Sequence, residues 1–293
     1  MTRPVFIEAA LNGPWSRKRQ PLMPVTTNAL ITEGIECARA GASVIHIHVY
    51  DPSTGQQFED FDAYRAVIEG IREVEDVIVY PTLPLSGFGT TAQTSTPDDR
   101  FSVVAQLAEA GLLEWSVIDP GSTQINELKP AEGEGVQFLY LNSEAEIRHG
   151  LELASLYEFV PSFAIYEPGF VRLGSMLCQL TKGCPKPIYR FMFSDKFSFG
   201  FPPEDIYLEA YIKLLNFCDP EAIWMIAGLQ VDLESIIEAS LAAGGHIRTG
   251  LEDAPFHSSE GNLDLVKQAA ETVCDANYDI GTATQFRKYL KSS

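Results

Sequence analysis

Short apolar segments rich in β-branched and aromatic residues alternate along the chain with longer stretches whose apolar residues recur at helical spacing. The short segments predict eight strands, at residues 5–11, 44–49, 77–82, 115–118, 162–166, 188–193, 223–227 and 246–251. The longer stretches predict eight helices, at residues 27–40, 61–74, 97–110, 144–157, 170–180, 204–217, 233–243 and 263–274. The pattern therefore repeats one strand–helix unit eight times.

Eight strands alternating with eight helices in one chain are typical of an α/β fold of the (β/α)₈, or TIM, barrel type. A doubly wound sheet is the main alternative, but it would favour a glycine-rich turn after the first strand, and residues 12–15 (NGPW) form no such turn. No shift in composition and no linker divides the chain, so we predict a single domain over residues 1–293. Residues 136–141 predict an extra strand after the fourth. The Gly-, Ser- and Thr-rich residues 83–96 predict a functional loop.

Composition limits the classes of partner. With 40 acidic and 21 basic residues among 293, the formal charge is −19, which disfavours binding to nucleic acid or to an anionic membrane. The only dense basic cluster, residues 17–19, is too short to reverse this. Five irregularly spaced cysteines favour free thiols in a reducing compartment. No apolar run suits a signal peptide or a membrane span, so we expect a cytoplasmic protein.

Two histidines close the second predicted strand as His46-Ile47-His48. Residues two apart on a strand point to one face, and active sites of such barrels lie at the carboxyl ends of the strands. Glu252 follows the eighth strand, which neighbours the first, so it can complete a His₂-Glu metal site. The alternative for the histidines is hydrogen bonding in the core, which the spacing makes the weaker interpretation. For Glu252 and Asp253, a helix cap or a solvated turn is equally compatible with the spacing.

Several longer motifs resemble one enzyme family. These motifs are HIHVYDP (46–52), GGHIRTGLEDAP (244–255), LVKQAAETV (265–273) and TATQFRKYL (282–290). Together with IEAALNG at residues 7–13, they make the chain similar to the beta-keto acid cleavage enzymes over nearly its whole length. The two histidines combined with R-x-G-x-E-D at this separation are the most specific part of the resemblance.

The resemblance implies a (β/α)₈ barrel that binds a divalent metal ion, usually Zn²⁺, through His46, His48 and Glu252. Similar enzymes condense a β-keto acid with acetyl-CoA and cleave the adduct to acetoacetate and a new acyl-CoA. Asp253, paired with Arg248, matches the base that removes the α-proton. A homo-oligomer is also implied. The predicted enzyme is thus an acyltransferase whose partners are small molecules.

The resemblance also suggests residues that bind the substrate, and here the chain departs from its relatives. Ser122 and Glu167 match positions near the pocket, and Thr82 lies in a segment, PTLP, that replaces a polar Gly-rich loop. Trp15 stands where some members carry a glutamate that suits an ammonium group. Tyr50 replaces an arginine that is common after the second histidine. We therefore expect the metal and base machinery to be retained and the substrate to differ.

Two other functions are compatible with the residues. One is a zinc-dependent hydrolase or aldolase on the same barrel. However, hydrolases of this type usually carry H-x-H on strand one and further histidines on later strands, and no later predicted strand here ends in histidine. The other is a barrel that binds a metal or a small molecule without catalysis, against which the preserved Asp253 argues, because binding alone needs no base.

Overall fold

The computed structural model describes residues 3–84, 96–130 and 135–292. Its central sheet has eight parallel strands in the order β4-β3-β2-β11-β10-β9-β8-β5, and it curves into a nearly closed barrel. The strands are β2 (Ile7–Ala10), β3 (Ala42–Ile47), β4 (Ile78–Pro81), β5 (Trp115–Val117), β8 (Val160–Ile165), β9 (Ile188–Phe193), β10 (Ile223–Gly228) and β11 (His246–Thr249). The predicted (β/α)₈ barrel in a single domain is confirmed.

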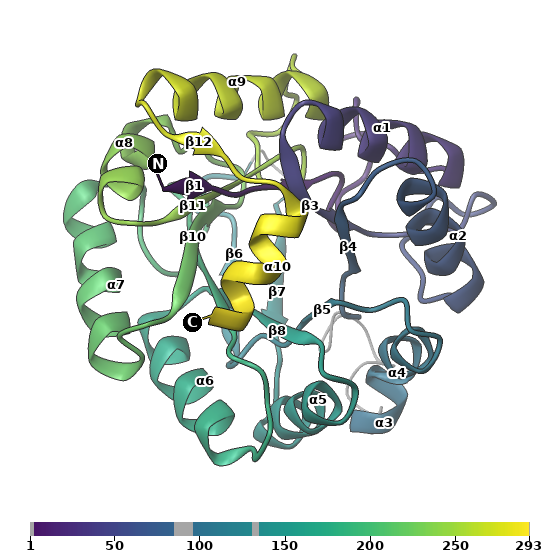
Figure 1. Ribbon diagram of the computed structural model, residues 1–293. Helices are drawn as coiled ribbons and strands as arrows, with labels where there is room; N and C mark the ends of the chain where they lie inside the picture. Colours follow the sequence, from purple (N-terminus) through teal and green to yellow (C-terminus); the bar gives the residue numbers. More distant parts are fainter. Residues whose placement is uncertain (1–2, 85–95, 131–134, 293) are drawn as a thin grey trace.

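A ring of helices surrounds the barrel (Figure 1). The helices of the ring are α1 (Thr27–Arg39), α2 (Phe61–Arg72), α3 (Pro97–Arg100), α4 (Ser102–Glu109), α5 (Glu144–Tyr157), α6 (Pro168–Leu180), α7 (Asp205–Cys218), α8 (Glu234–Ala242) and α9 (Asn262–Asp275). Capping boxes formed by Thr96 and Ser143 stabilise the amino-terminal ends of α3 and α5. The single helix predicted over residues 97–110 is divided in two, because the backbone of Phe101 leaves the helical region (φ −95°, ψ 8°).

Several elements were not predicted as such. The chain forms a small parallel pair, β1 (Pro4–Val5) with β12 (Asp279–Ile280), so the first predicted strand is divided at Phe6. Helix α10 (Ala283–Ser292) crosses the middle of the barrel in Figure 1. Its Phe286 stacks on Phe6 with ring centroids 3.9 Å apart and contacts Trp115 edge-on at 5.2 Å. Because both partners lie at the starts of strands, α10 closes the amino-terminal end of the barrel.

An antiparallel hairpin, β6 (Thr123–Asn126) with β7 (Gln137–Tyr140), follows β5 at the other end. It contains the extra strand that the sequence predicted after the fourth. The predicted functional loop lies mostly outside the described residues, which end at Pro84 and resume at Thr96. All five cysteines are free thiols. Within the described segments, helices capable of crossing a membrane are absent.

Candidate metal centre and active site

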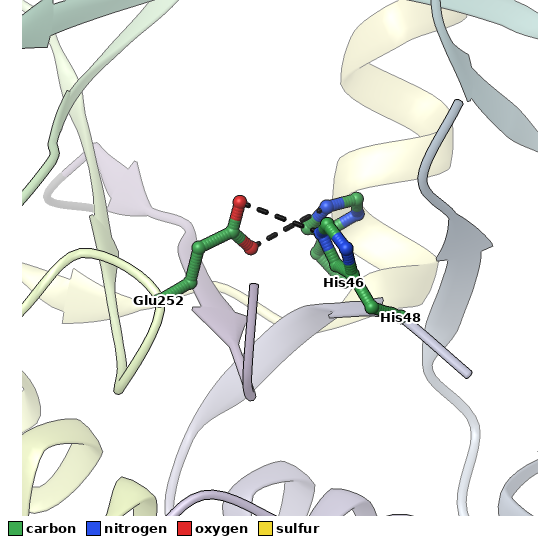
Figure 2. Close-up of side chains that lie close together, drawn as sticks. All are labelled: His46, His48 and Glu252. Carbon is green, nitrogen blue, oxygen red and sulfur yellow. Dashed lines mark ion pairs between the residues drawn. The ribbon is translucent and has the colours of Figure 1, made fainter. Parts of the chain in front are cut away.

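The carboxyl ends of β3 and β11 bring His46, His48 and Glu252 together. His46 lies near the end of β3 and His48 follows directly, while Glu252 lies three residues beyond β11. Strand β2 separates the two strands and joins them, since the Leu11 amide donates to the His46 carbonyl and the Glu252 amide donates to the Ala10 carbonyl. The carboxylate of Glu252 is 3.5 Å from Nε2 of each histidine, and one ligand atom from each residue lies within 4.8 Å of the others (Figure 2).

The chemistry of this cluster fits a divalent metal ion. Three of its buried polar atoms have no hydrogen-bond partner within the described part of the chain, namely His46 Nδ1, His48 Nε2 and Glu252 Oε2. Burial lowers the pKa of His46 well below its usual value, so its imidazole is neutral and keeps a free lone pair. Burial would raise the pKa of Glu252, but the positive charge of Arg248 opposes this effect, and the pKa of Glu252 lies well below its usual value. Two imidazoles and one carboxylate are the ligand set of many catalytic zinc sites.

Asp253 is held by Arg248 through three hydrogen bonds, from Nε to Oδ2 (2.9 Å) and Oδ1 (3.2 Å) and from Nη2 to Oδ1 (2.7 Å). The amide of Gly228 also donates to Oδ2 (3.2 Å). Burial raises the pKa of Asp253 to about 6, against the opposing effect of Arg248. Arg248 reaches Glu252 as well, at 3.1 Å, so one guanidinium orients both carboxylates.

Consecutive residues on a strand would point to opposite faces, yet Glu252 and Asp253 are both buried and both contact Arg248. The reason is that β11 ends at Thr249 and Gly250 turns the chain with φ +130°. A Cβ on Gly250 would lie 2.3 Å from the Ala10 carbonyl oxygen, so only glycine fits there. The turn lets the candidate ligand Glu252 and the candidate base Asp253 contact the same guanidinium, but Asp253 itself lines a separate pocket, together with Val231 and Pro255.

A cavity of about 50 Å³ adjoins the cluster and is lined by both histidines, Glu252 and Arg248. Trp15 and Thr82, which we expect to contact the substrate, also line it. Much of the remaining wall is apolar or aromatic, formed by Leu83, Ile125, Phe138, Tyr166, Met192 and Leu229. The site therefore combines charged side chains, those of Glu252 and Arg248, with a largely apolar remainder of the wall.

The other two candidates for substrate binding, Ser122 and Glu167, are absent from the lining of this cavity. The exposed Ser122 hydroxyl donates to the Asn142 carbonyl (3.0 Å) and accepts from its amide (2.8 Å). Glu167 accepts hydrogen bonds from the Thr123 hydroxyl (3.0 Å) and the Gly200 amide (3.4 Å). In the structure both side chains hold loops beside the cavity.

Trp15 is fixed in place by several contacts. Its indole Nε1 donates to the Glu252 carbonyl (2.8 Å), and its ring stacks on Phe197 at 6.2 Å and meets Phe256 edge-on at 5.0 Å. The hydroxyl of Tyr50 binds the carbonyls of Gly13 and Trp15. Tyr50, one of the departures from related sequences, thus anchors the loop that carries Trp15.

Sequence analysis missed a group of buried polar residues that is connected to Glu252 through Arg248. Glu8 on β2 accepts hydrogen bonds from the Tyr80 hydroxyl (2.6 Å) and from Arg248 Nη1 (3.1 Å). Arg190 on β9 donates to the Tyr80 hydroxyl (3.2 Å) and lies 3.7 Å from Asp119. The available signal was a charged residue inside an otherwise apolar strand, as in IEAA (7–10) and IYRFMF (188–193).

Asp119 and Tyr140 were missed as well, although both line the cavity. The Tyr140 hydroxyl donates to Asp119 Oδ2 (2.5 Å), and the Ala164 amide donates to Oδ1 (2.7 Å). Asp119 therefore ties the β6–β7 hairpin to β8. Burial raises the pKa of Asp119, although Arg190 opposes this shift.

Comparisons with known proteins support the fold and identify the family. The solved ternary complex of ObcA with a C4-CoA adduct and oxalate superposes with a TM-score of 0.67, at 16% identity, over 92% of this chain and 68% of that chain. This likeness shows the fold alone. The chain is 26% identical to 3-oxoadipate:acetyl-CoA acetyltransferase of Cupriavidus necator, over 99% of this chain and 95% of the relative. It is 25% identical to 3-dehydrocarnitine:acetyl-CoA trimethylamine transferase of Rhizobium meliloti, over 99% of this chain and 97% of the relative.

A family model described as beta-keto acid cleavage enzyme matches residues 4–291. This match confirms the resemblance that the sequence motifs carry, because it spans all of those motifs as well as the barrel strands. The chain therefore belongs to the beta-keto acid cleavage enzyme family.

Proposed function

We propose that this protein transfers an acyl group between a β-keto acid and acetyl-CoA, releasing acetoacetate and a new acyl-CoA. In balance, R–CO–CH₂–COO⁻ and acetyl-CoA give R–CO–CoA and acetoacetate. The observation that carries this proposal is the buried cluster of His46, His48 and Glu252 in one cavity, whose Arg248 also holds the buried Asp253. Relatives that match over almost their whole length are named as acetyl-CoA transferases of keto acids, which supports the same reaction class.

Each candidate site residue has a separate proposed role. His46, His48 and Glu252 would hold the metal ion, and we propose Zn²⁺ because of this ligand set. When bound, such an ion supplies Lewis acidity that stabilises negative charge on a keto oxygen. Asp253 would accept the proton from the carbon between the two carbonyl groups. Arg248 fixes the carboxylate of Asp253 by three hydrogen bonds and balances its charge.

Ser122 and Glu167 would act on the substrate from the loops that they hold, and Thr82 and Trp15 would do so from the cavity wall. We further propose that the enzyme is a cytoplasmic homo-oligomer. The proposed use of acetyl-CoA, a metabolite inside the cell, supports the location, and the family resemblance supports the oligomer.

The function is tested by incubating the purified protein with acetyl-CoA and a panel of β-keto acids, and measuring acetoacetate and the new thioester. We expect both products, in equal amounts, and only when both substrates are present. If the keto acid were consumed without acetyl-CoA, the hydrolase or aldolase alternative would replace this proposal. If no keto acid reacted while one bound, the non-catalytic alternative would hold.

The same panel tests the substrate preference. The apolar wall and Trp15 lead us to expect a neutral or apolar β-keto acid to react faster than the ammonium-bearing 5-amino-3-ketohexanoate. An unpaired ammonium group is costly to bury, whereas each buried methylene contributes about 0.8 kcal/mol, so the ratio of kcat/KM values would reach roughly tenfold to a hundredfold. A trimethylammonium keto acid belongs in the panel because an aromatic ring such as Trp15 binds such a cation.

Trp15→Glu should shift the preference towards the primary amine, because it places a carboxylate on the wall. Trp15→Phe is the matched control, since it keeps an aromatic surface and should keep the wild-type order of substrates. A wild-type enzyme that prefers the primary amine would show that the wall does not select the substrate.

A further inference from the structure

A side chain outside the ligand set contacts His48 on the side away from Glu252. Nδ1 of His48 lies 2.8 Å from Oε1 of Gln57, and Nε2 of the same ring faces the Glu252 carboxylate at 3.5 Å. Carbonyl oxygens only accept hydrogen bonds, so this contact requires the proton of the imidazole to be on Nδ1. The lone pair of Nε2 is then free for a metal ion.

The loop after β3 is built to place Gln57 at this position. The backbone of Gln57 forms an antiparallel bridge with Tyr50. On either side, the Asp51 amide donates to the Gln56 carbonyl (2.9 Å), and the Phe58 amide donates to the Val49 carbonyl (3.2 Å). The loop therefore folds back along the segment that carries His48, and Gln57 returns beside the imidazole.

A second contact orients the amide group of Gln57. Its Nε2 donates to Oε1 of Glu59 at 3.2 Å, so the amide oxygen is directed to His48. A flipped amide would present NH₂ to Nδ1, favour the other tautomer and occupy Nε2 with a proton. Glu59, Gln57 and His48 thus form a chain of hydrogen bonds that ends at the proposed metal.

We propose that Gln57 is a positioning residue for the metal ion, which it serves by fixing the tautomer and the ring orientation of His48. This inference rests on the metal site in the proposed function. Partners of this kind usually change metal affinity by about 10- to 100-fold when they are removed. Gln57 supplies a neutral amide, so it orients the ligand without adding negative charge beside the metal.

The test measures Zn²⁺ affinity by competition with a chromophoric chelator, using the wild type, Gln57→Met and Gln57→Glu. Methionine has a similar length but offers no comparable acceptor, so we expect Gln57→Met to weaken binding by about 10- to 100-fold. Gln57→Glu keeps an acceptor oxygen and should retain the wild-type affinity or exceed it. Gln56→Leu is the matched control, because Gln56 is the neighbouring exposed glutamine.

The thermal unfolding of the metal-free proteins separates positioning from simple loss of structure. We expect Gln57→Met and Gln56→Leu to unfold at the same temperature without metal and to differ only in affinity. Wild-type affinity in Gln57→Met, or an equal loss in Gln57→Glu, would overturn the role of Gln57. If the wild-type protein itself bound no Zn²⁺ above the level of His48→Ala, the proposed metal site would fail instead.

Discussion

Replacing Asp253 with asparagine is expected to lower kcat by roughly 10²-fold or more, while the metal content and the fold stay intact. Asparagine has nearly the same shape and still accepts a hydrogen bond from Arg248, but it cannot take up a proton. The wild-type carboxylate is buried and paired with Arg248, whose guanidinium lines the cavity, which suits a base that acts away from bulk water. The measurement is kcat with acetyl-CoA and the best keto acid of the panel.

Asp62→Asn is the matched control, because Asp62 is an exposed aspartate on α2 and should leave kcat unchanged. Arg248→Ala is a harsher change. It would leave Glu8, Glu252 and Asp253 without their shared guanidinium, so both activity and stability should fall. Full activity in Asp253→Asn would show that another group removes the proton.

Removing a proposed ligand is expected to abolish metal binding. The purified wild type should hold about one divalent ion per chain, and His46→Ala or Glu252→Gln should hold little or none. Both variants should remain folded, because the hydrophobic core of the barrel extends around all eight strands and does not depend on one ion. Elemental analysis gives the metal content, and circular dichroism checks the fold.

His149→Ala is the control for loss of a histidine. This side chain lies on α5, partly exposed and 3.4 Å from Asp98, far along the chain from the proposed ligands. The variant should keep the full metal content. Undiminished metal in both His46→Ala and Glu252→Gln would place the ion elsewhere.

The barrel is predictable because its strands are buried on both faces and therefore almost continuously apolar, as ASVIHI (42–47) and IWMIAG (223–228) are. Helix α10 was missed for a different reason. Its sequence is polar overall, and its contribution lies in the way that Phe286 meets Phe6 and Trp115, which are far away in the sequence. Contacts of that kind follow from closure of the barrel and leave little local signal.

The candidate site shows the same division. His46 and His48 stand out because two histidines share the face of one strand. Glu252 follows the eighth strand, which neighbours the first, and motif resemblance adds the roles of Asp253 and Arg248. Asp119 and Arg190 carry no comparable pattern, since each is one charged residue whose partner comes from a distant strand. Gln57 is a polar residue in a polar loop, and only the folding of that loop against His48 reveals its contact.

Glycine at position 250 has a consequence for how this enzyme can evolve. The turn at Gly250 is followed directly by the short segment that carries both Glu252 and Asp253. A side chain at position 250 would collide with the Ala10 carbonyl. An insertion or deletion between Gly250 and Glu252 would displace the proposed ligand and the proposed base together. New substrate ranges would then arise in separate segments, such as the loop that carries Trp15, whose changes leave the short segment after Gly250 untouched.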